Sequence, residues 1–179
     1  MKTNFSRRLL ACALFLCASG AAPAFSQVAI VNINWEVSTL AGKDRSPFAP
    51  VKELRAAPDF KFPDRVRALV TLRNPSSNPV EGLVLHYALS LRLLKKGEAP
   101  EKAFWGVPFY VEEVRVSKVN PSSERQAKVI HFDLQTQLNK LRNSGFEPSA
   151  LRMSVMLSPR QGDEPAAIIR ESIIEILKP

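Results

Sequence analysis

Apolar and polar side chains alternate with a period of two residues along much of this chain. The first such segment covers residues 31–37, where Val31, Ile33, Trp35 and Val37 alternate with polar residues. The same pattern recurs over residues 66–72, 83–93 and 151–157. Side chains two apart lie on one face of a strand, so each segment predicts a half-buried β-strand, with Trp35 in the core.

The segment 107–119 changes phase in its middle. Apolar residues occupy odd positions up to Val111 and even positions from Val114 onward. One extra residue in a strand reverses which face its side chains occupy. The sequence therefore predicts a β-bulge or a strand break near Glu112 and Glu113.

A shorter strand and one helix follow. Apolar residues at 130, 132 and 134 predict a short strand, and Leu134, Leu138 and Leu141 repeat at helical spacing. With Asp133 before this repeat and Gly145 after it, we expect one short helix near residues 134–143.

Two further segments are less regular. The tail, 166–177, follows a helix-start signal at Pro165, but its five isoleucines favour a strand, which is the structure we expect. Residues 40–64 contain four prolines and predict a long loop, with room for a helical turn over 50–55.

These elements together predict an all-β fold. About seven strands joined by turns are typical of a two-sheet antiparallel β-sandwich. Asn-Pro-Ser-Ser occurs at both 74–77 and 120–123 and has turn chemistry each time. The pattern resembles the immunoglobulin and fibronectin-III class in general architecture, although the Cys…Trp…Cys hallmark of immunoglobulin domains is missing.

The N-terminal residues read as a secretory signal peptide. A run of about 14 apolar residues follows the basic residues Lys2, Arg7 and Arg8. This run is too short to span a bilayer, and two A-x-A-like cleavage sites follow it. We expect a signal peptide at 1–26, cut after Ala24 or Ser26, and a single domain at 27–179, periplasmic or extracellular. Both cysteines lie in this leader, so no disulfide is expected in the mature chain.

Charge argues against nucleic acid as a partner. The chain has 25 Lys and Arg against 17 Asp and Glu, and three of these basic residues lie in the leader. The remaining excess of five is mild and is interspersed with acidic residues, whereas nucleic-acid binding requires a basic patch or stripe.

Candidate chemistry is sparse. The chain lacks the G-x-S-x-G, H-E-x-x-H and phosphate-loop motifs, and its only histidines, His86 and His131, fall in separate predicted strands. Glu112 and Glu113 form an adjacent pair of acidic residues, but neighbours in a regular strand point to opposite faces, so acid–base catalysis would need a bulge there. We expect no cofactor, no metal site and no enzymatic activity.

The best candidate for binding is the aromatic segment 104–110, which contains Phe104, Trp105, Phe109 and Tyr110. Such rings stack on sugars or anchor protein interfaces. The alternative is that Trp105 and Phe109 plug one end of the sandwich.

The expected outward faces of the strands are also unusually apolar. They carry six apolar side chains: Leu69, Val84, Ala88, Leu94, Val129 and Met156. Either a partner covers this surface, or the segment 40–64 does so through Phe48, Val51, Leu54 and Phe60; we expect the second.

We therefore expect an exported, non-enzymatic module that binds an envelope or secreted protein through the aromatic segment or a sheet edge. The alternative function is binding of carbohydrate or peptidoglycan through segment 104–110. A hydrolase with paired carboxylates is a third possibility.

Overall fold

The structure is a computed structural model that describes residues 28–56, 64–129, 134–142 and 144–178. Seven long strands are found in these residues: β1 (Ala29–Ser38), β6 (Arg65–Asn74), β7 (Val80–Lys95), β9 (Tyr110–Val119), β10 (Ser123–Val129), β11 (Phe146–Leu157) and β12 (Ile169–Leu177). Five strands are short: β2 (Leu40–Ala41), β3 (Asp44–Arg45), β4 (Ala49–Pro50), β5 (Glu53–Arg55) and β8 (Phe104–Trp105). The helical elements are η2 (Pro100–Lys102, a 3₁₀ helix), α1 (Leu134–Arg142) and α2 (Pro165–Ile168).

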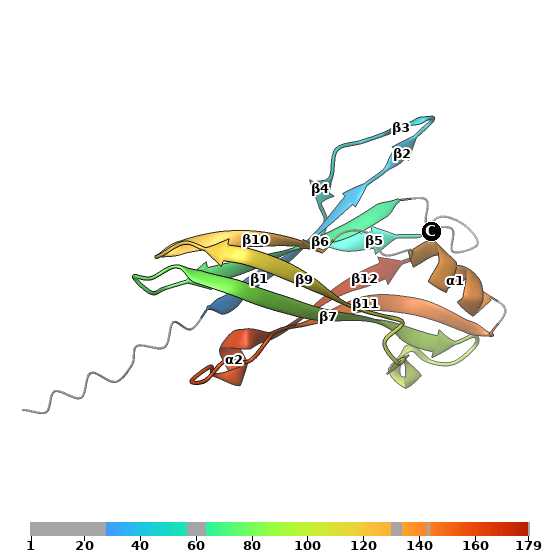
Figure 1. The fold of residues 1–179 in the computed structure, drawn as a ribbon. Coiled ribbons are helices and arrows are strands. Elements are labelled where there is room, and N and C mark those ends of the chain that lie inside the picture. The colour runs from blue at the N-terminus through green and yellow to red at the C-terminus, as the bar shows by residue number, and fades with distance from the viewer. Residues whose placement is uncertain (1–27, 57–63, 130–133, 143, 179) are drawn as a thin grey trace, which may run out of the picture.

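The long strands form two sheets that face each other (Figure 1). The small sheet has the order β10–β6–β1–β4, and the large sheet has the order β5–β12–β11–β7, with β9 and β8 on the far edge of β7. β2 and β3 form a separate hairpin that projects from the sandwich (Figure 1). The predicted two-sheet β-sandwich is confirmed, except that β5 pairs with β12 in parallel.

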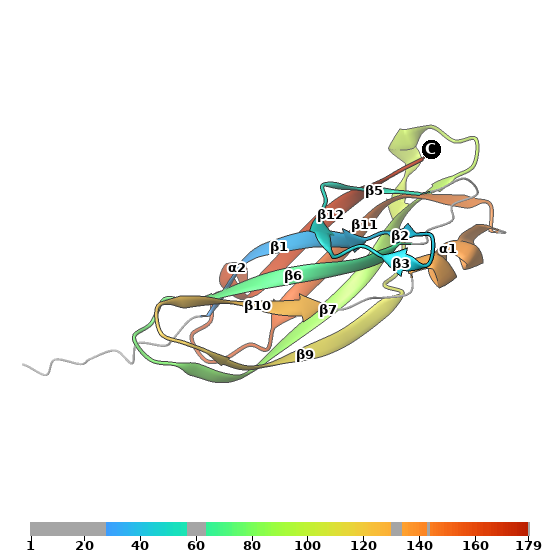
Figure 2. The ribbon, with the colours of Figure 1, turned by 90° about the horizontal axis from the view of Figure 1, so that it is seen from above.

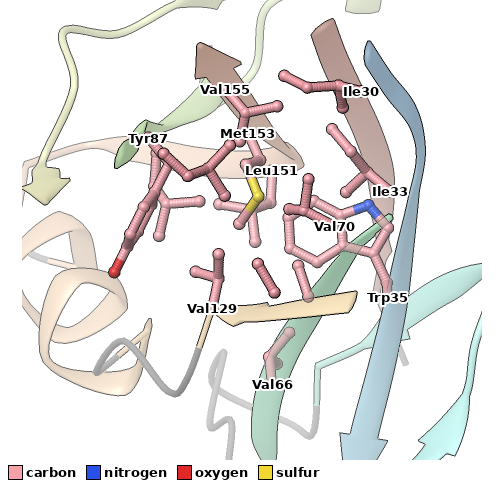
Figure 3. Packing of buried hydrophobic residues seen from close by; sticks show 14 of the residues in the cluster. Ile30, Ile33, Trp35, Val66, Val70, Tyr87, Val129, Leu151, Met153 and Val155 are labelled. Atoms are coloured by element: carbon pink, nitrogen blue, oxygen red, sulfur yellow. The ribbon is translucent and has the colours of Figure 1, made fainter. Parts of the chain in front are cut away.

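The core lies between the two inner faces. Figure 3 shows Leu151 and Met153 of the large sheet pointing toward Val70 and Trp35 of the small sheet. Trp35 is buried as predicted, and its Nε1 donates to Ser172 Oγ of β12 at 2.9 Å. This partly buried hydrogen bond joins the two sheets.

The predicted phase of β1 is wrong at Val31. The pairing of β1 with β6 shifts register between Ile30 and Asn32, as at a β-bulge. Ile30 and Ile33 are therefore both buried, while Val31 is only half-buried.

The predicted bulge at Glu112 and Glu113 is also wrong. β9 pairs with β7 in one constant register through both residues, from Leu89↔Tyr110 to Leu83↔Val116. The break lies upstream, at residues 106–109, between β8 and β9. Phe109 belongs to this break rather than to the regular strand, which removes the apparent conflict in phase.

Helix α1 confirms the predicted helix, with residue 143 outside the described residues. The predicted strand over 130–134 is not supported at its end, because Leu134 begins α1; Ile130 and Phe132 lie outside the described residues. The strand of this region is β10, which ends earlier, at Val129. Leu134 and Leu138 of α1 are buried against the core.

The tail confirms the strand prediction through β12, and the helix-start signal at Pro165 produces only the four-residue α2.

In the proline-rich segment the predicted helical turn is wrong, since β4 and β5 occupy that stretch. Each joins the edge of a different sheet, so this segment bridges one side of the sandwich. In the described residues, no helix has the length and apolar character needed to cross a membrane.

Candidate binding surface

The outer face of the large sheet is defined by the strand register. Leu85, Leu89 and Leu91 of β7 point into the core, so the even-numbered residues of β7 point outward. The pairings Val111↔Ala88 and Met156↔His86 then place Val111 of β9 and Met156 of β11 on this outer face, because residues opposite each other in paired strands share a face.

This outer face carries most of the exposed large apolar side chains of the described residues. Of the eight large hydrophobic side chains that are exposed in the described residues, five lie here: Val111, Met156, Ile169, Ile173 and Leu177. Val111 is 68% exposed, Ile173 51% and Ile169 47%. A shallow depression of about 230 Å³ runs over these strands, with Ala88, Val111 and Met156 in its lining. Apolar side chains gathered on one face in this way mark interaction surfaces more often than scattered ones do.

The described residues of the proline-rich segment, 40–56 and 64, do not cover this face. Leu54 is 1% exposed and Val51 packs against the core, but both lie at the side of the sandwich where β4 and β5 bridge the sheets. Phe48 lies over the guanidinium of Arg67 on the small sheet, 4.1 Å from its ring centroid to Cζ. Phe60 lies outside the described residues. Phe48, Val51 and Leu54 therefore do not provide the expected coverage of the outer face of the large sheet.

The six residues expected to face outward divide into two groups. Leu69 and Val129 are buried, and Val129 belongs to the core because β10 turns its odd-numbered residues inward. Val84, Ala88 and Leu94 are half-buried, and Met156 is exposed. All four lie on the large sheet, which locates the uncovered apolar surface there.

Charged side chains also lie on this face, and they are paired with one another. Arg92 Nη2 lies 3.0 Å from Glu175 Oε2, and Arg152 Nη1 lies 3.9 Å from Glu171 Oε2. On β9, Arg115 Nε lies 3.9 Å from Glu113 Oε1. Acidic and basic groups therefore balance locally, and the face suits a partner surface that is apolar and near neutral.

The four predicted aromatic residues do not form one platform. Trp105 pairs with Arg92 and so lies on the outer face, half-buried beneath the guanidinium of Arg152, whose Cζ is 4.5 Å from the ring centroid. Phe104 is 48% exposed and meets Phe146 edge to face, with 5.7 Å between centroids.

Phe109 and Tyr110 pack against the core on the inner side. The Tyr110 ring lies 6.0 Å from that of Tyr87. Burial, and then the neighbouring Tyr110 and Glu112, raise the pKa of Tyr87 well above its usual range.

The break at residues 106–109 positions these rings. Gly106 N–H donates to Leu91 O at 2.9 Å, and a Cβ at this position would lie only 3.3 Å from Leu93 Cδ1. Glycine thus permits the close approach to β7, while Val107 projects outward and is 86% exposed.

A small apolar cleft opens between this break and α1. Its volume is about 210 Å³, and its lining includes Leu91, Val107, Phe109 and Leu141, with Lys140 as its charged residue. A cavity of about 150 Å³ accommodates a benzene ring, so this cleft has room for one apolar side chain.

Of the side chains considered for catalysis, His86, Glu112 and Glu113 lie on the large sheet. His86 Nε2 lies 2.8 Å from Ser158 Oγ, so these two side chains hydrogen-bond to each other. Glu112 and Glu113 point to opposite faces because β9 is regular there, so they cannot share a proton. His131 lies outside the described residues, and the part of the chain that is described holds no group of three potential metal ligands.

Sequence reasoning missed the contribution of β12 to this surface. The isoleucines of the tail predicted a strand, but Ile169, Ile173 and Leu177 occupy every fourth position and share one face with Glu171 and Glu175. That spacing was the available signal for an apolar outward face.

Comparison with protein-family models gave no match to this chain, and a search of curated proteins gave none either.

Proposed function

We propose that this protein is an exported, non-enzymatic module that binds another protein of the cell envelope through the outer face of its large sheet. The observation that carries the proposal is the concentration of exposed apolar side chains on that face, with Val111 and Ile173 more than half exposed. Export rests on the signal-peptide pattern of residues 1–26.

The nature of the surface favours a protein partner. Its exposed apolar side chains span β9, β11 and β12, and the charged side chains between them are paired with one another, which suits an apolar, near-neutral protein surface. The adjoining Trp105 offers an aromatic anchor at one border, and such side chains are frequent hot spots of protein interfaces.

The alternative, binding of a glycan by segment 104–110, has less support. Stacking on sugars needs free ring faces, but Arg152 covers one face of Trp105, and Phe109 and Tyr110 pack against the core. Phe104 is the ring of this group with substantial exposure.

A photo-cross-linking side chain placed at Ile173 in the cell tests the proposal. We expect one protein adduct at this position and none at Lys128, an exposed residue on β10 of the small sheet. Ile173→Asp should abolish recovery of the same partner while leaving the melting temperature nearly unchanged, because the side chain is already 51% exposed. A partner recovered equally with Ile173→Asp, or adducts confined to Lys128, would contradict the proposal, and retention on cell-wall glycan alone would favour the alternative.

A further inference from the structure

The edge strand β9 carries unpaired main-chain groups. Within the described residues, β9 pairs with β7 and with no other strand. Ser158, the residue that follows β11, donates its main-chain N–H to Val84 O. Main-chain groups alternate in direction along a strand, so the even-numbered residues of β7 direct theirs toward β11 and the odd-numbered residues direct theirs toward β9.

The register of β9 then shows which of its groups face the open edge. Leu85↔Val114 is a hydrogen-bonded pair, so the even-numbered residues of β9 turn their N–H and C=O groups toward β7. The N–H and C=O groups of Val111, Glu113 and Arg115 consequently point away from the sheet. β10 reaches β9 near the far end of the strand, where Arg125 Nη1 donates to Lys118 O. Figure 2 shows β9 along the outer edge of the sandwich.

We propose that a second copy of this chain pairs with this edge, so that two β9 strands run antiparallel about a two-fold axis through Val114 and join the two large sheets into one. An open edge with free N–H and C=O groups is a template for such pairing. A two-fold axis makes the contact self-complementary and closes it at a dimer.

The charges of β9 select this register. With the axis at Val114, Glu113 of each copy lies directly opposite Arg115 of the other copy, on the outer face of the joined sheet. Glu113 and Arg115 are also residues whose main-chain N–H and C=O groups face the open edge. Each Glu113–Arg115 pair between the two copies would therefore form main-chain hydrogen bonds as well as an ion pair between side chains. Opposite charges across paired strands stabilise the sheet, whereas like charges destabilise it.

The neighbouring registers are unfavourable. An axis through Glu113 would place two glutamates opposite each other, and an axis through Arg115 would place two arginines opposite each other. At the Val114 axis, the two half-buried valines meet on the inner side, where they extend the core. The Val111 side chains of both copies then belong to one continuous outer face.

Reversal of charge tests the pairing. The side chain of Arg115 is 85% exposed, so Arg115→Glu should preserve the fold. The substitution would place two acidic residues opposite each other at both of the pairs between positions 113 and 115. We therefore expect the dimer dissociation constant, measured by sedimentation equilibrium, to rise about tenfold or more. The double variant Glu113→Arg with Arg115→Glu exchanges the two charges and should restore the dimer. Lys128→Glu, the same charge change on β10, is the matched control and should leave the constant unchanged.

Three results would overturn the proposal: a wild-type chain that stays monomeric over the whole micromolar range, a dimer as insensitive to Arg115→Glu as to Lys128→Glu, or a double variant that does not recover the dimer.

A second measurement is independent of charge. With Cys12 and Cys17 of the leader replaced by serine, Val114→Cys should form a disulfide-linked dimer on mild oxidation, because directly opposite Cβ atoms lie about 5 Å apart. A cysteine at Lys128 should not do so, and failure of the Val114→Cys variant to cross-link would exclude this axis.

Discussion

The guanidinium of Arg152 lies over the indole of Trp105, with 4.5 Å between Cζ and the ring centroid. Trp105 comes from β8 and Arg152 from β11, two strands that lie on opposite sides of β7. Within the described residues Arg152 Nε is buried without a hydrogen-bond partner, so the contact with the indole is a main interaction of this side chain. Trp105 therefore belongs to the outer surface of the large sheet rather than to the interior.

The two tryptophans should differ sharply in their effect on stability. We expect Trp105→Ala to lower the free energy of unfolding by about 1–2 kcal/mol, since it removes a half-exposed cation–π contact. Trp35→Ala should cost about 3–5 kcal/mol, since it leaves a cavity in the core and an unpaired Ser172 hydroxyl. Urea denaturation of both variants provides the comparison, and equal losses would mean that Trp105 plugs the core after all.

Leu54 is the largest fully buried side chain that the described part of the proline-rich segment adds to the core. Leu54 is 1% exposed and inserts from β5 into the core, so Leu54→Ala should lower the free energy of unfolding by about 2–5 kcal/mol. Lys52→Ala, two residues earlier and exposed, is the control and should change it by less than about 0.5 kcal/mol. A small effect of Leu54→Ala in thermal or urea unfolding would show that the segment is dispensable for the core.

Asn74 joins the two Asn-Pro-Ser-Ser turns. This residue is fully buried, and its Nδ2 donates to the main-chain oxygens of Asn78, Val119 and Asn120 at 2.8–3.2 Å. Its Oδ1 accepts from Ser76 N–H at 3.0 Å. Asn74→Ala would leave several of these groups unpaired in the interior, and we expect a loss of about 2–4 kcal/mol.

Asn120 supplies the matched control for this prediction. It opens the second copy of the same turn sequence, but its side chain is exposed and its main-chain oxygen is the group that accepts the bonds. Asn120→Ala should therefore be nearly neutral in urea denaturation. Equal effects of the two substitutions would show that the turn sequence, rather than the buried amide of Asn74, sets the stability.

Tyr87 should make stability fall at alkaline pH. Burial, followed by the effects of Tyr110 and Glu112, raises the pKa of Tyr87 in the folded chain above its ordinary value near 10. Its contribution is thus fully present below pH about 10 and is lost as the pH rises further, by up to about 1.4 kcal/mol per pH unit.

Urea denaturation between pH 8 and about pH 12 measures this loss. Tyr87→Phe should flatten the decline relative to the wild type, because the group that titrates is gone. Tyr110→Phe keeps Tyr87 buried, so most of the decline should remain. If Tyr87→Phe declined as steeply as the wild type, the loss would have to come from other groups.

The fold class could be predicted from the sequence because the alternation of apolar and polar residues within each long strand shows which of its faces is buried. The odd-numbered leucines of β7 and the even-numbered apolar residues of β6 each define a face within a few residues, and no distant partner is needed to recognise it. Helix α1 was predictable for the same reason, from the spacing of Leu134, Leu138 and Leu141.

The alternation could not show where a strand breaks, since a bulge depends on the neighbouring strand. Gly106 approaches Leu91 O only because β7 runs beside it, and this contact, rather than the charges at Glu112 and Glu113, fixes the break. The positions of Val31 and Val129 were missed for the same reason, as each depends on pairing with β6.

What the sequence by itself determined is which segments become strands and which of their side chains avoid water, since both follow from local periodicity. Only the tertiary structure decided which apolar face remains uncovered. Ile169 lies opposite Met156, Ile173 lies opposite Arg152, and both isoleucines share the large sheet with Val111, because β12, β11, β7 and β9 assemble in that order. Strand order depends on contacts between residues far apart in the chain, so no local sequence pattern predicts it.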